Sequence, residues 1–206
     1  MYSVPTFLFP PISYCVFLQQ AHPHKDVLSF YHKQSPRNHF EILGANGRQK
    51  ITFGVKSNGG IKTPLQDIFL DDGDWSRTAL RSIQSAYGKS AFYFFYQHEL
   101  EKLILDCKGQ NLALTHQTIH DWLHRYGMVP QWPDESAEVT PIVVEKKWEI
   151  TSPIQSYHQV FQDRFPFQND LSILDLMFNL GPEAKGYLHQ HAIVTPVLVD
   201  RRNSLE

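Results

Sequence analysis

The sequence predicts a mixed α/β fold, in which an N-terminal mixed sheet with a β-hairpin precedes a largely helical C-terminal half packed on it. Short runs of β-forming residues, separated by turn residues, fill roughly the first third of the 206 residues. Segments with the period of amphipathic helices fill most of the rest. At this length the pattern favours one domain, 1–206, whose helices cover a sheet. Leu205 and Glu206 are compatible with a cloning remnant.

The first strands follow from local composition. An Asn-Gly pair, Asn46-Gly47, lies between two alternating runs and predicts a hairpin. Pro11 suits the first position of a short helix, because its missing N–H has no intrahelical partner there. The runs expected to form strands are 2–9, 27–31, 40–42, 51–55 and 65–70, with one further strand within 129–152.

The helices are predicted from their periodicity and from the residues at their ends. Asp74, Asn111 and Asp170 stand where side chains cap helix N-termini. Gly88, Gly127 and Gly181-Pro182 stand where helices end. The expected helices are 12–18, 75–87, 92–105, 112–126 and 171–180, with a short one following to about 191. The proline-bearing stretch near 130–141 is the best candidate for a hinge.

Charge and cysteine content exclude several classes of protein. The net charge is −2 and the pI is near 6.6, so a surface that binds nucleic acid is not expected. Cys15 and Cys107 are the only cysteines, which is too few for a disulfide framework and does not match a zinc ribbon. Residues 1–20 lack a basic start and contain Pro5, Pro10 and Pro11, and no run reaches the ~18 apolar residues that span a bilayer. We therefore expect a cytoplasmic protein with reduced thiols and no membrane span.

A polar loop after the expected second strand is the first candidate site. Lys33, Arg37 and Asn38 lie close together there, and open sheets bind ligands beyond the carboxyl ends of their strands. Arg37 is suited to a bidentate contact with a carboxylate or phosphate, and Asn38 to an amide or hydroxyl. A solvated loop with surface ion pairs is an equally good interpretation.

Asp175 and Asn179 form the second candidate. They are four residues apart on an otherwise apolar helix, so they share a face. A buried acid needs a partner or a raised pKa, and either condition suits a general base. The more frequent alternative is an acid that hydrogen-bonds a neighbouring loop.

Histidines and aromatics provide weaker signals. His116, His120 and His124 share one helix face, but no acid-rich catalytic motif accompanies them. A structural stripe is therefore favoured over a metal site, and no metal is predicted. Residues 92–96 are consecutive aromatics, so they cannot all face the core. Those left exposed could bind a sugar or mediate self-association.

Several blocks, in order, resemble the WbqC-like family of bacterial proteins. The matching blocks are 5–14, 33–38, 42–47, 62–65, 74–75, 82–87 and, most distinctively, 169–183. The sequence departs from the family pattern at Cys15, at Pro36 and around His39. The resemblance implies an uncharacterised α/β protein associated with gene clusters for surface polysaccharide or O-antigen biosynthesis, where transfer of an aminoacyl or acyl group to a sugar has been suggested.

The polar loop and the acid, together with what the family resemblance implies, lead to two candidate functions. The first is a transferase acting on a small-molecule or sugar-derived substrate, with no particular cofactor indicated. In it Asp175 is the catalytic base, and the substrate-binding residues are Tyr14, Lys33, Arg37, Asn38 and Asn179. The second is a non-catalytic binding or self-association module that uses the aromatic run around Phe94 and the proline-rich stretch. The sequence is compatible with a homo-oligomer.

Overall fold

The structure is a computed structural model that describes residues 2–25, 30–31, 36–56, 63–133, 140–141, 148, 150 and 153–191. It confirms the mixed α/β prediction. The helices are α1 (Ile12–Ala21), α2 (Trp75–Tyr87), α3 (Tyr93–Asp106), α4 (Leu112–Arg125), α5 (Ile173–Leu180) and α6 (Glu183–Gln190), with a 3-10 turn at Leu65–Asp67. The strands are β1 (Tyr2–Val4), β2 (His24–Lys25), β3 (His39–Gly44), β4 (Gly47–Thr52), β5 (Val55–Lys56), β6 (Phe69–Leu70) and β7 (Thr140–Pro141).

The strands of the described chain form three small sheets. β1 lies between β2 and β7, parallel to both, while β3 pairs with β4 and β5 with β6 in antiparallel fashion. The expected strand over 2–9 ends at Val4, because Pro5 has no N–H with which to extend the ladder. The expected strand over 65–70 is wrong in its first half, where a 3-10 turn follows Pro64 and only Phe69–Leu70 pair. Most of the strand expected over 27–31 lies outside the described residues, as does the middle of the predicted hinge near 130–141, residues 134–139.

The hairpin is confirmed with a defined register. Gly44 pairs with Gly47, so the turn is Ala45-Asn46, and Glu41 stands opposite Lys50. Gly47 has a φ of 102°, a conformation that glycine adopts without steric cost. The register decides which side chains share the outer face of the hairpin, and this face lines the site described below.

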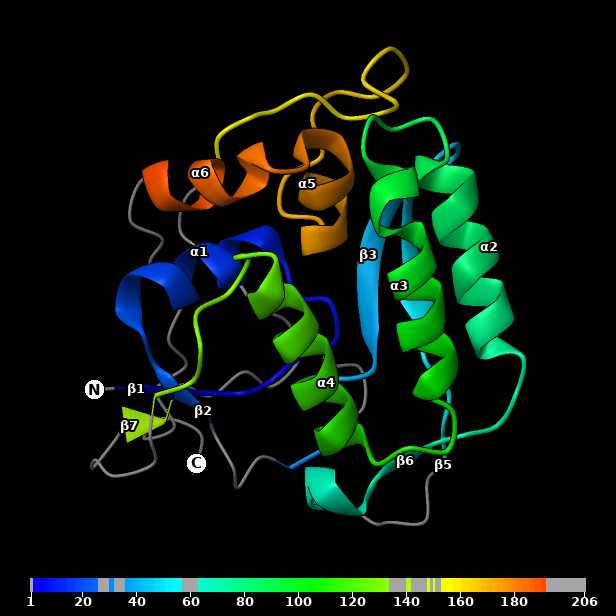
Figure 1. Cartoon of the computed structure of the whole chain (residues 1–206), viewed down its shortest axis with the longest axis vertical. Coiled ribbons are helices and arrows are strands. Elements are labelled where there is room, and N and C mark those ends of the chain that lie inside the picture. The colour runs from blue at the N-terminus through cyan, green and yellow to red at the C-terminus, as the bar shows by residue number, and fades with distance from the viewer. Residues whose placement is uncertain are drawn as a thin grey trace, which may run out of the picture.

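The helices enclose the N-terminal segment. In Figure 1, α2 and α3 stand beside β3, α1, α5 and α6 gather on the other side, and α4 lies between these groups. The segment after β1 runs through the core, where the Phe9 ring makes edge contacts with Phe40, Phe53 and Trp122. Both cysteines are buried and free. No helix in the described part of the chain has the length and apolar character needed to cross a membrane.

One predicted cap is wrong, and another, Asp74, takes the N-cap position of α2 without a side-chain capping hydrogen bond. Asn111 caps α4 as expected, accepting a hydrogen bond of 3.1 Å from the Leu114 N–H. The cap of α5, however, is Ser172 rather than Asp170, and the helix begins at Ile173. Asp170 has a φ of 57° and directs its carboxylate to Ser13 in the first turn of α1. The acid thus caps a helix that is 157 residues away in sequence, which local pattern cannot reveal.

Gly181, between α5 and α6, should not tolerate a side chain. Its φ of 54° and ψ of −125° suit only glycine, and an added Cβ would lie 2.4 Å from the Phe92 ring. We expect Gly181→Ala to lower the free energy of unfolding by at least about 2 kcal/mol in urea denaturation. Gly186→Ala is the matched control: a Cβ there meets nothing within 4 Å, and alanine favours the helix. Equal stability of the two variants would contradict the prediction.

Candidate functional site

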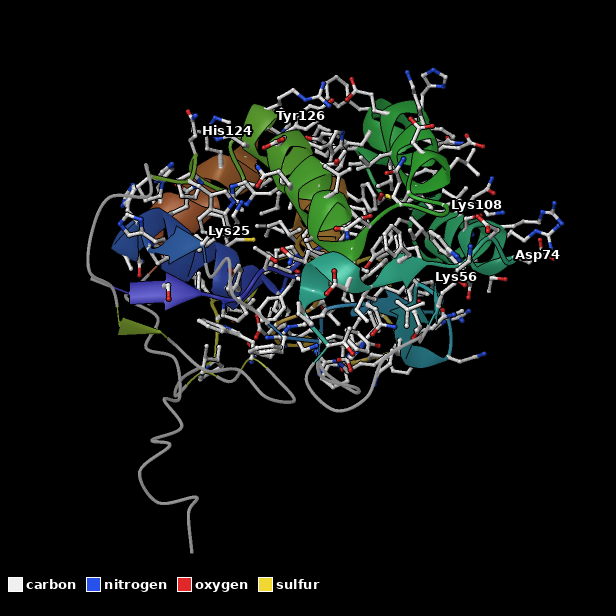
Figure 2. The ribbon with its side chains drawn as sticks, turned by 90° about the horizontal axis from the view of Figure 1, so that it is seen from below. Lys25, Lys56, Asp74, Lys108, His124 and Tyr126 are labelled. Atoms are coloured by element: carbon white, nitrogen blue, oxygen red, sulfur yellow. The ribbon has the colours of Figure 1, made fainter. Side chains whose placement is uncertain are left out.

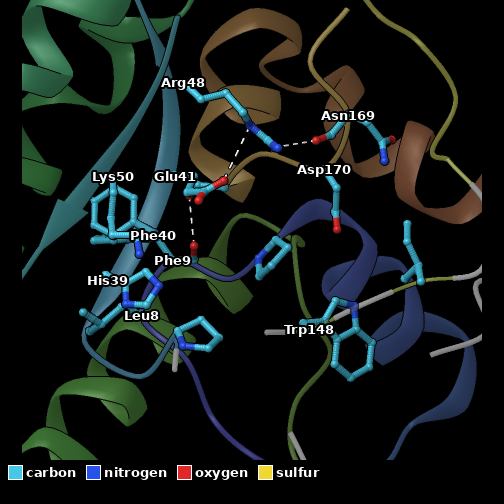
Figure 3. Close-up of a pocket in the computed structure, with 14 residues that line it drawn as sticks. Leu8, Phe9, His39, Phe40, Glu41, Arg48, Lys50, Trp148, Asn169 and Asp170 are labelled. Carbon is cyan, nitrogen blue, oxygen red and sulfur yellow. Dashed lines mark hydrogen bonds and ion pairs between the residues drawn. The ribbon is translucent and has the colours of Figure 1, made fainter. Parts of the chain in front are cut away.

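A pocket of about 690 Å³ opens between the outer face of the β3–β4 hairpin, the N-terminal segment and the stretch before α5 (Figure 3). One part of its described lining is polar: His39, Glu41, Arg48, Lys50, Asn169, Asp170 and Ser172. The other part is apolar: Leu8, Phe9, Pro11, Pro36, Phe40, Trp148 and Ile150. This combination of an apolar surface with a few polar groups is typical of a small-molecule site.

The hairpin supplies the charged wall. His39 and Glu41 of β3 and Arg48 and Lys50 of β4 line the pocket together, as alternation along paired strands allows. Arg48 is held from two sides: its Nε lies 3.5 Å from Glu41 Oε2, and its Nη2 donates to the Asn169 carbonyl at 2.6 Å. Figure 3 shows this arrangement above the pocket. Lys50 is exposed and forms no hydrogen bond or ion pair with another described residue.

His39 is the titratable group of the pocket best suited to proton transfer. Its ring is half-buried. Burial lowers the pKa of His39, the Lys50 charge lowers it further, and Glu41 acts in the opposite direction. The imidazole is therefore predominantly neutral at neutral pH, and a neutral imidazole can accept a proton.

A chain of hydrogen bonds supports the opposite wall. The Trp148 indole Nε1–H donates to Ser13 Oγ at 2.9 Å, and the Ser13 hydroxyl and N–H both donate to the Asp170 carboxylate at 2.8 Å. The Trp148 ring also meets the Tyr14 and Phe17 rings at centroid distances of 4.9 and 5.5 Å. Trp148 and Asp170 are thus fixed in place before any ligand arrives.

Backbone hydrogen bonds join the segments beneath the pocket. The Ser172 N–H donates to the Glu41 carbonyl and the Ile173 N–H to the Pro10 carbonyl, at 2.9 and 2.8 Å. The Ser172 hydroxyl donates to the Phe9 carbonyl at 3.0 Å. Three segments far apart in sequence therefore form one rigid base.

Asp175, the predicted base, lies in a buried network. Its carboxylate accepts hydrogen bonds from Tyr87 Oη at 2.8 Å, from Gln159 Nε2 at 3.1 Å and from Tyr157 Oη. Burial raises the pKa of Asp175, while the hydrogen bonds from Tyr157, Tyr87 and Gln159 and the Arg48 charge lower it. Asn179 donates to the Asp175 carbonyl at 2.8 Å. The carboxylate therefore connects α5 to α2 and to the loop that precedes α5.

The other predicted residues lie beside the N-terminal segment. Tyr14 Oη donates to the Pro5 carbonyl at 2.6 Å, and Asn38 Nδ2 donates to the Phe53 carbonyl at 3.0 Å. Burial and Cys15 raise the pKa of Tyr14, and the charge of Arg37, which is 4% exposed, partly offsets them. Lys33 lies outside the described residues. The positive charge that lowers the pKa of Asp175 is that of Arg48, not of the predicted Arg37. The described pocket lining includes neither Asp175 nor Arg37.

Each of the three histidines on α4 binds a backbone carbonyl. His116 Nε2 and His120 Nε2 donate to Arg37 and Pro130, at 2.6 and 2.9 Å, and His124 Nδ1 donates to Val129 at 3.0 Å. Burial lowers the pKa of His116 to about 3 and that of His120 to about 4. A neutral His116 that donates through Nε2 must accept through Nδ1, where the Thr6 hydroxyl lies at 2.7 Å. These contacts hold the chain segments that pack against α4.

Sequence reasoning missed the charged wall of the pocket. A usable signal was present. In the register of the predicted hairpin, Glu41 lies opposite Lys50, and His39 and Arg48 lie close by on the same face. The contribution of Asn169 and Asp170 had no such signal, since these residues reach the pocket only through the packing of α5 against the N-terminal segment.

The chain was then compared with known proteins. It is 22% identical over 195 residues to the uncharacterized protein Rv1507c of Mycobacterium tuberculosis (strain ATCC 25618 / H37Rv), covering 77% of this chain and 83% of that protein. No solved structure matches the chain. The family model of the WbqC-like protein family matches residues 8–148, which include the hairpin and much of the pocket lining. The chain therefore belongs to the WbqC-like protein family.

Proposed function

We propose that this protein is a transferase that moves an aminoacyl or acyl group onto a sugar during surface-polysaccharide biosynthesis, and that the pocket beside the β3–β4 hairpin is its active centre. The observation that carries the proposal is His39, a half-buried imidazole beside the charged groups of Glu41 and Lys50, at the edge of a pocket large enough for a sugar. Family membership, and the polysaccharide setting that the family resemblance implies, support the same class of substrate.

The proposed chemistry needs a base and a fixed pocket. His39 takes the proton from a sugar hydroxyl or amine as its oxygen or nitrogen attacks the acyl carbonyl carbon. The new bond forms, the bond to the leaving group breaks, and the imidazolium returns the proton to the leaving group. Asp175 acts as a positioning residue in this scheme. It holds Gln159, whose side chain contacts both the N–H and the carbonyl of Gln168, next to the pocket residue Asn169.

A transfer assay with variants tests the proposal. Nucleotide-linked amino sugars are incubated with acetyl coenzyme A or with a glycyl thioester, and mass spectrometry detects acylated sugar. His39→Gln should slow product formation by about 100-fold or more, the usual contribution of a general base, without changing the melting temperature greatly. His98→Gln, which alters an exposed histidine on α3, is the control and should retain full activity. Product formation by His39→Gln at the unaltered rate would contradict the assignment.

The second candidate function, a self-association module, is favoured by one observation. Phe94 and Phe95 at the start of α3 are 75% and 68% exposed. Exposed aromatic side chains that are adjacent in this way often mark contact surfaces. Light scattering coupled to size-exclusion chromatography distinguishes the cases: a dimer that Phe94→Ser and Phe95→Ser dissociate would support this function, and a monomer at high concentration would remove it.

A further inference from the structure

Some charged side chains of the described pocket lining have a partner of opposite charge or a hydrogen-bond donor, and one does not. Glu41 is paired with Arg48, and the Asp170 carboxylate accepts hydrogen bonds from Ser13. Lys50 lines the same pocket, yet its ammonium has no such partner among the described residues. The carboxylates of the described lining are thus engaged, while one cation stays available.

The hairpin geometry explains why Lys50 is left without a partner. Glu41 is its register partner, and a cross-strand pair of opposite charge would ordinarily form there. Glu41 instead meets Arg48, which lies two residues along β4 from Lys50 in the diagonal position. The hydrogen bond from Arg48 to the Asn169 carbonyl fixes the guanidinium in that position. Arg48 of β4 and Asn169 of the stretch before α5 thus hold Glu41 away from Lys50.

We propose that Lys50 anchors an anionic group of the substrate, a phosphoryl or carboxylate group, and that the body of the ligand lies across the apolar part of the pocket near Pro36, Trp148 and Ile150. This inference rests on the proposed function and deepens it by naming the substrate class. An ammonium on a flexible stem suits such a group, because it can follow the anion without a preset geometry. The ligand is therefore an anion with a ring or an apolar body, as in a sugar phosphate or an activated acyl donor.

The charge of Lys50, the proposed anchor, also affects the pKa of His39. Burial lowers the pKa of His39, and the Lys50 charge lowers it further. An anion bound to Lys50 offsets that charge, so it favours the imidazolium that forms when His39 takes a proton. Glu41 and Arg48, the other charged groups of this wall, are already paired with each other. Binding of the anion thus also increases the proton affinity of His39, the proposed base.

Calorimetric titration of the full chain tests the anchor directly. The probes are inorganic pyrophosphate, inorganic phosphate and acetate, with glucose as the uncharged reference. We expect the unaltered chain to bind an anion, Lys50→Gln to bind it about 10-fold or more weakly, as for loss of one charge-assisted contact, and Lys50→Arg to retain most of the affinity. Stronger binding of the phosphates would identify a phosphoryl group, and stronger binding of acetate a carboxylate.

The control is Lys56→Gln. Lys56 is an exposed lysine at the end of β5 that pairs with Asp72, and it is labelled in Figure 2. This variant should bind the anion as the unaltered chain does. A second readout is the His39 ring proton in NMR, whose titration should move to higher pH when the anion is added and should not move in Lys50→Gln.

The outcomes separate this inference from the proposed function. Absence of binding by all three anions, or equal binding by Lys50→Gln and the unaltered chain, overturns the anchor. Anion binding that depends on Lys50, in a protein without transfer activity, supports the anchor and counts against the transferase.

Discussion

We expect the protein to lose much of its stability below pH 6.5, with His116 as a principal cause. Burial lowers the pKa of His116 from 6.5 to about 3, so between these values the unfolded chain binds a proton that the folded chain does not. The stabilising contribution is therefore complete above pH 6.5 and disappears as the pH falls through about 3. At about 1.36 kcal/mol per pKa unit, the loss is on the order of 4–5 kcal/mol, a large share of the stability of a domain.

Two other buried groups modify this profile. His120, whose pKa burial lowers to about 4, acts in the same direction as His116 over a narrower range. Asp175 acts in the opposite direction: burial raises its pKa above 3.8, so its contribution to stability decreases as the pH rises. Among these three groups, the histidines of α4 therefore have the larger effect on stability in acid.

Urea denaturation at a series of pH values between 7.5 and about 4 measures the effect. His116→Gln should be less stable than the unaltered chain at pH 7.5, because glutamine does not fill the space between Thr6 and Arg37 in the same way. Its stability should nevertheless depend much less on pH. His98→Gln is the control on the exposed side of α3 and should follow the unaltered chain. A parallel pH dependence for His116→Gln would show that His116 titrates normally.

The second large effect is expected at Asp175. Asp175→Ala leaves the Tyr87 and Tyr157 hydroxyls without their acceptor in a buried site, and it removes one acceptor of the Gln159 amide, which keeps the Gln168 carbonyl. Each buried group without a partner costs about 1–3 kcal/mol, and these contributions are not additive, so we expect a loss of at least about 3 kcal/mol in the free energy of unfolding. Asp175→Asn should lose less, because the amide keeps one acceptor and tyrosine hydroxyls can accept from its NH₂ group.

Denaturation of both variants, with Asp163→Ala as control, tests this expectation. Asp163 lies in the loop before α5 but is exposed, so its removal should change stability by less than about 0.5 kcal/mol. If Asp175→Ala proved as stable as Asp163→Ala, the network would have no structural importance.

Asp175→Asn also separates the two roles considered for this acid. A folded, stable Asp175→Asn that lost all transfer activity would support the catalytic base predicted from the sequence. Activity that declines only in step with stability would support a positioning role, with His39 as the base.

Features set by neighbouring residues were predictable from the sequence. The hairpin was predictable from Asn46-Gly47 between alternating runs, α2 from its period, and the start of α4 from Asn111. In each case the physical cause, a turn conformation, an amphipathic face or a capping hydrogen bond, acts over a few residues. The end of β1 had a local cause as well, since Pro5 interrupts an otherwise suitable run.

The partners of the polar residues were decided only in the tertiary structure. Asp175 meets Tyr87, which is 88 residues away, and Asp170 meets Ser13, which is 157 residues away. Their types and spacing indicate that they need partners, because buried acids must be hydrogen-bonded, but not which partners. By itself the sequence therefore determined the α/β class, the family resemblance, most helices and the hairpin. Packing of α5 and the N-terminal segment against that hairpin determined which side chains share the pocket, because such contacts depend on chain segments that meet only after folding.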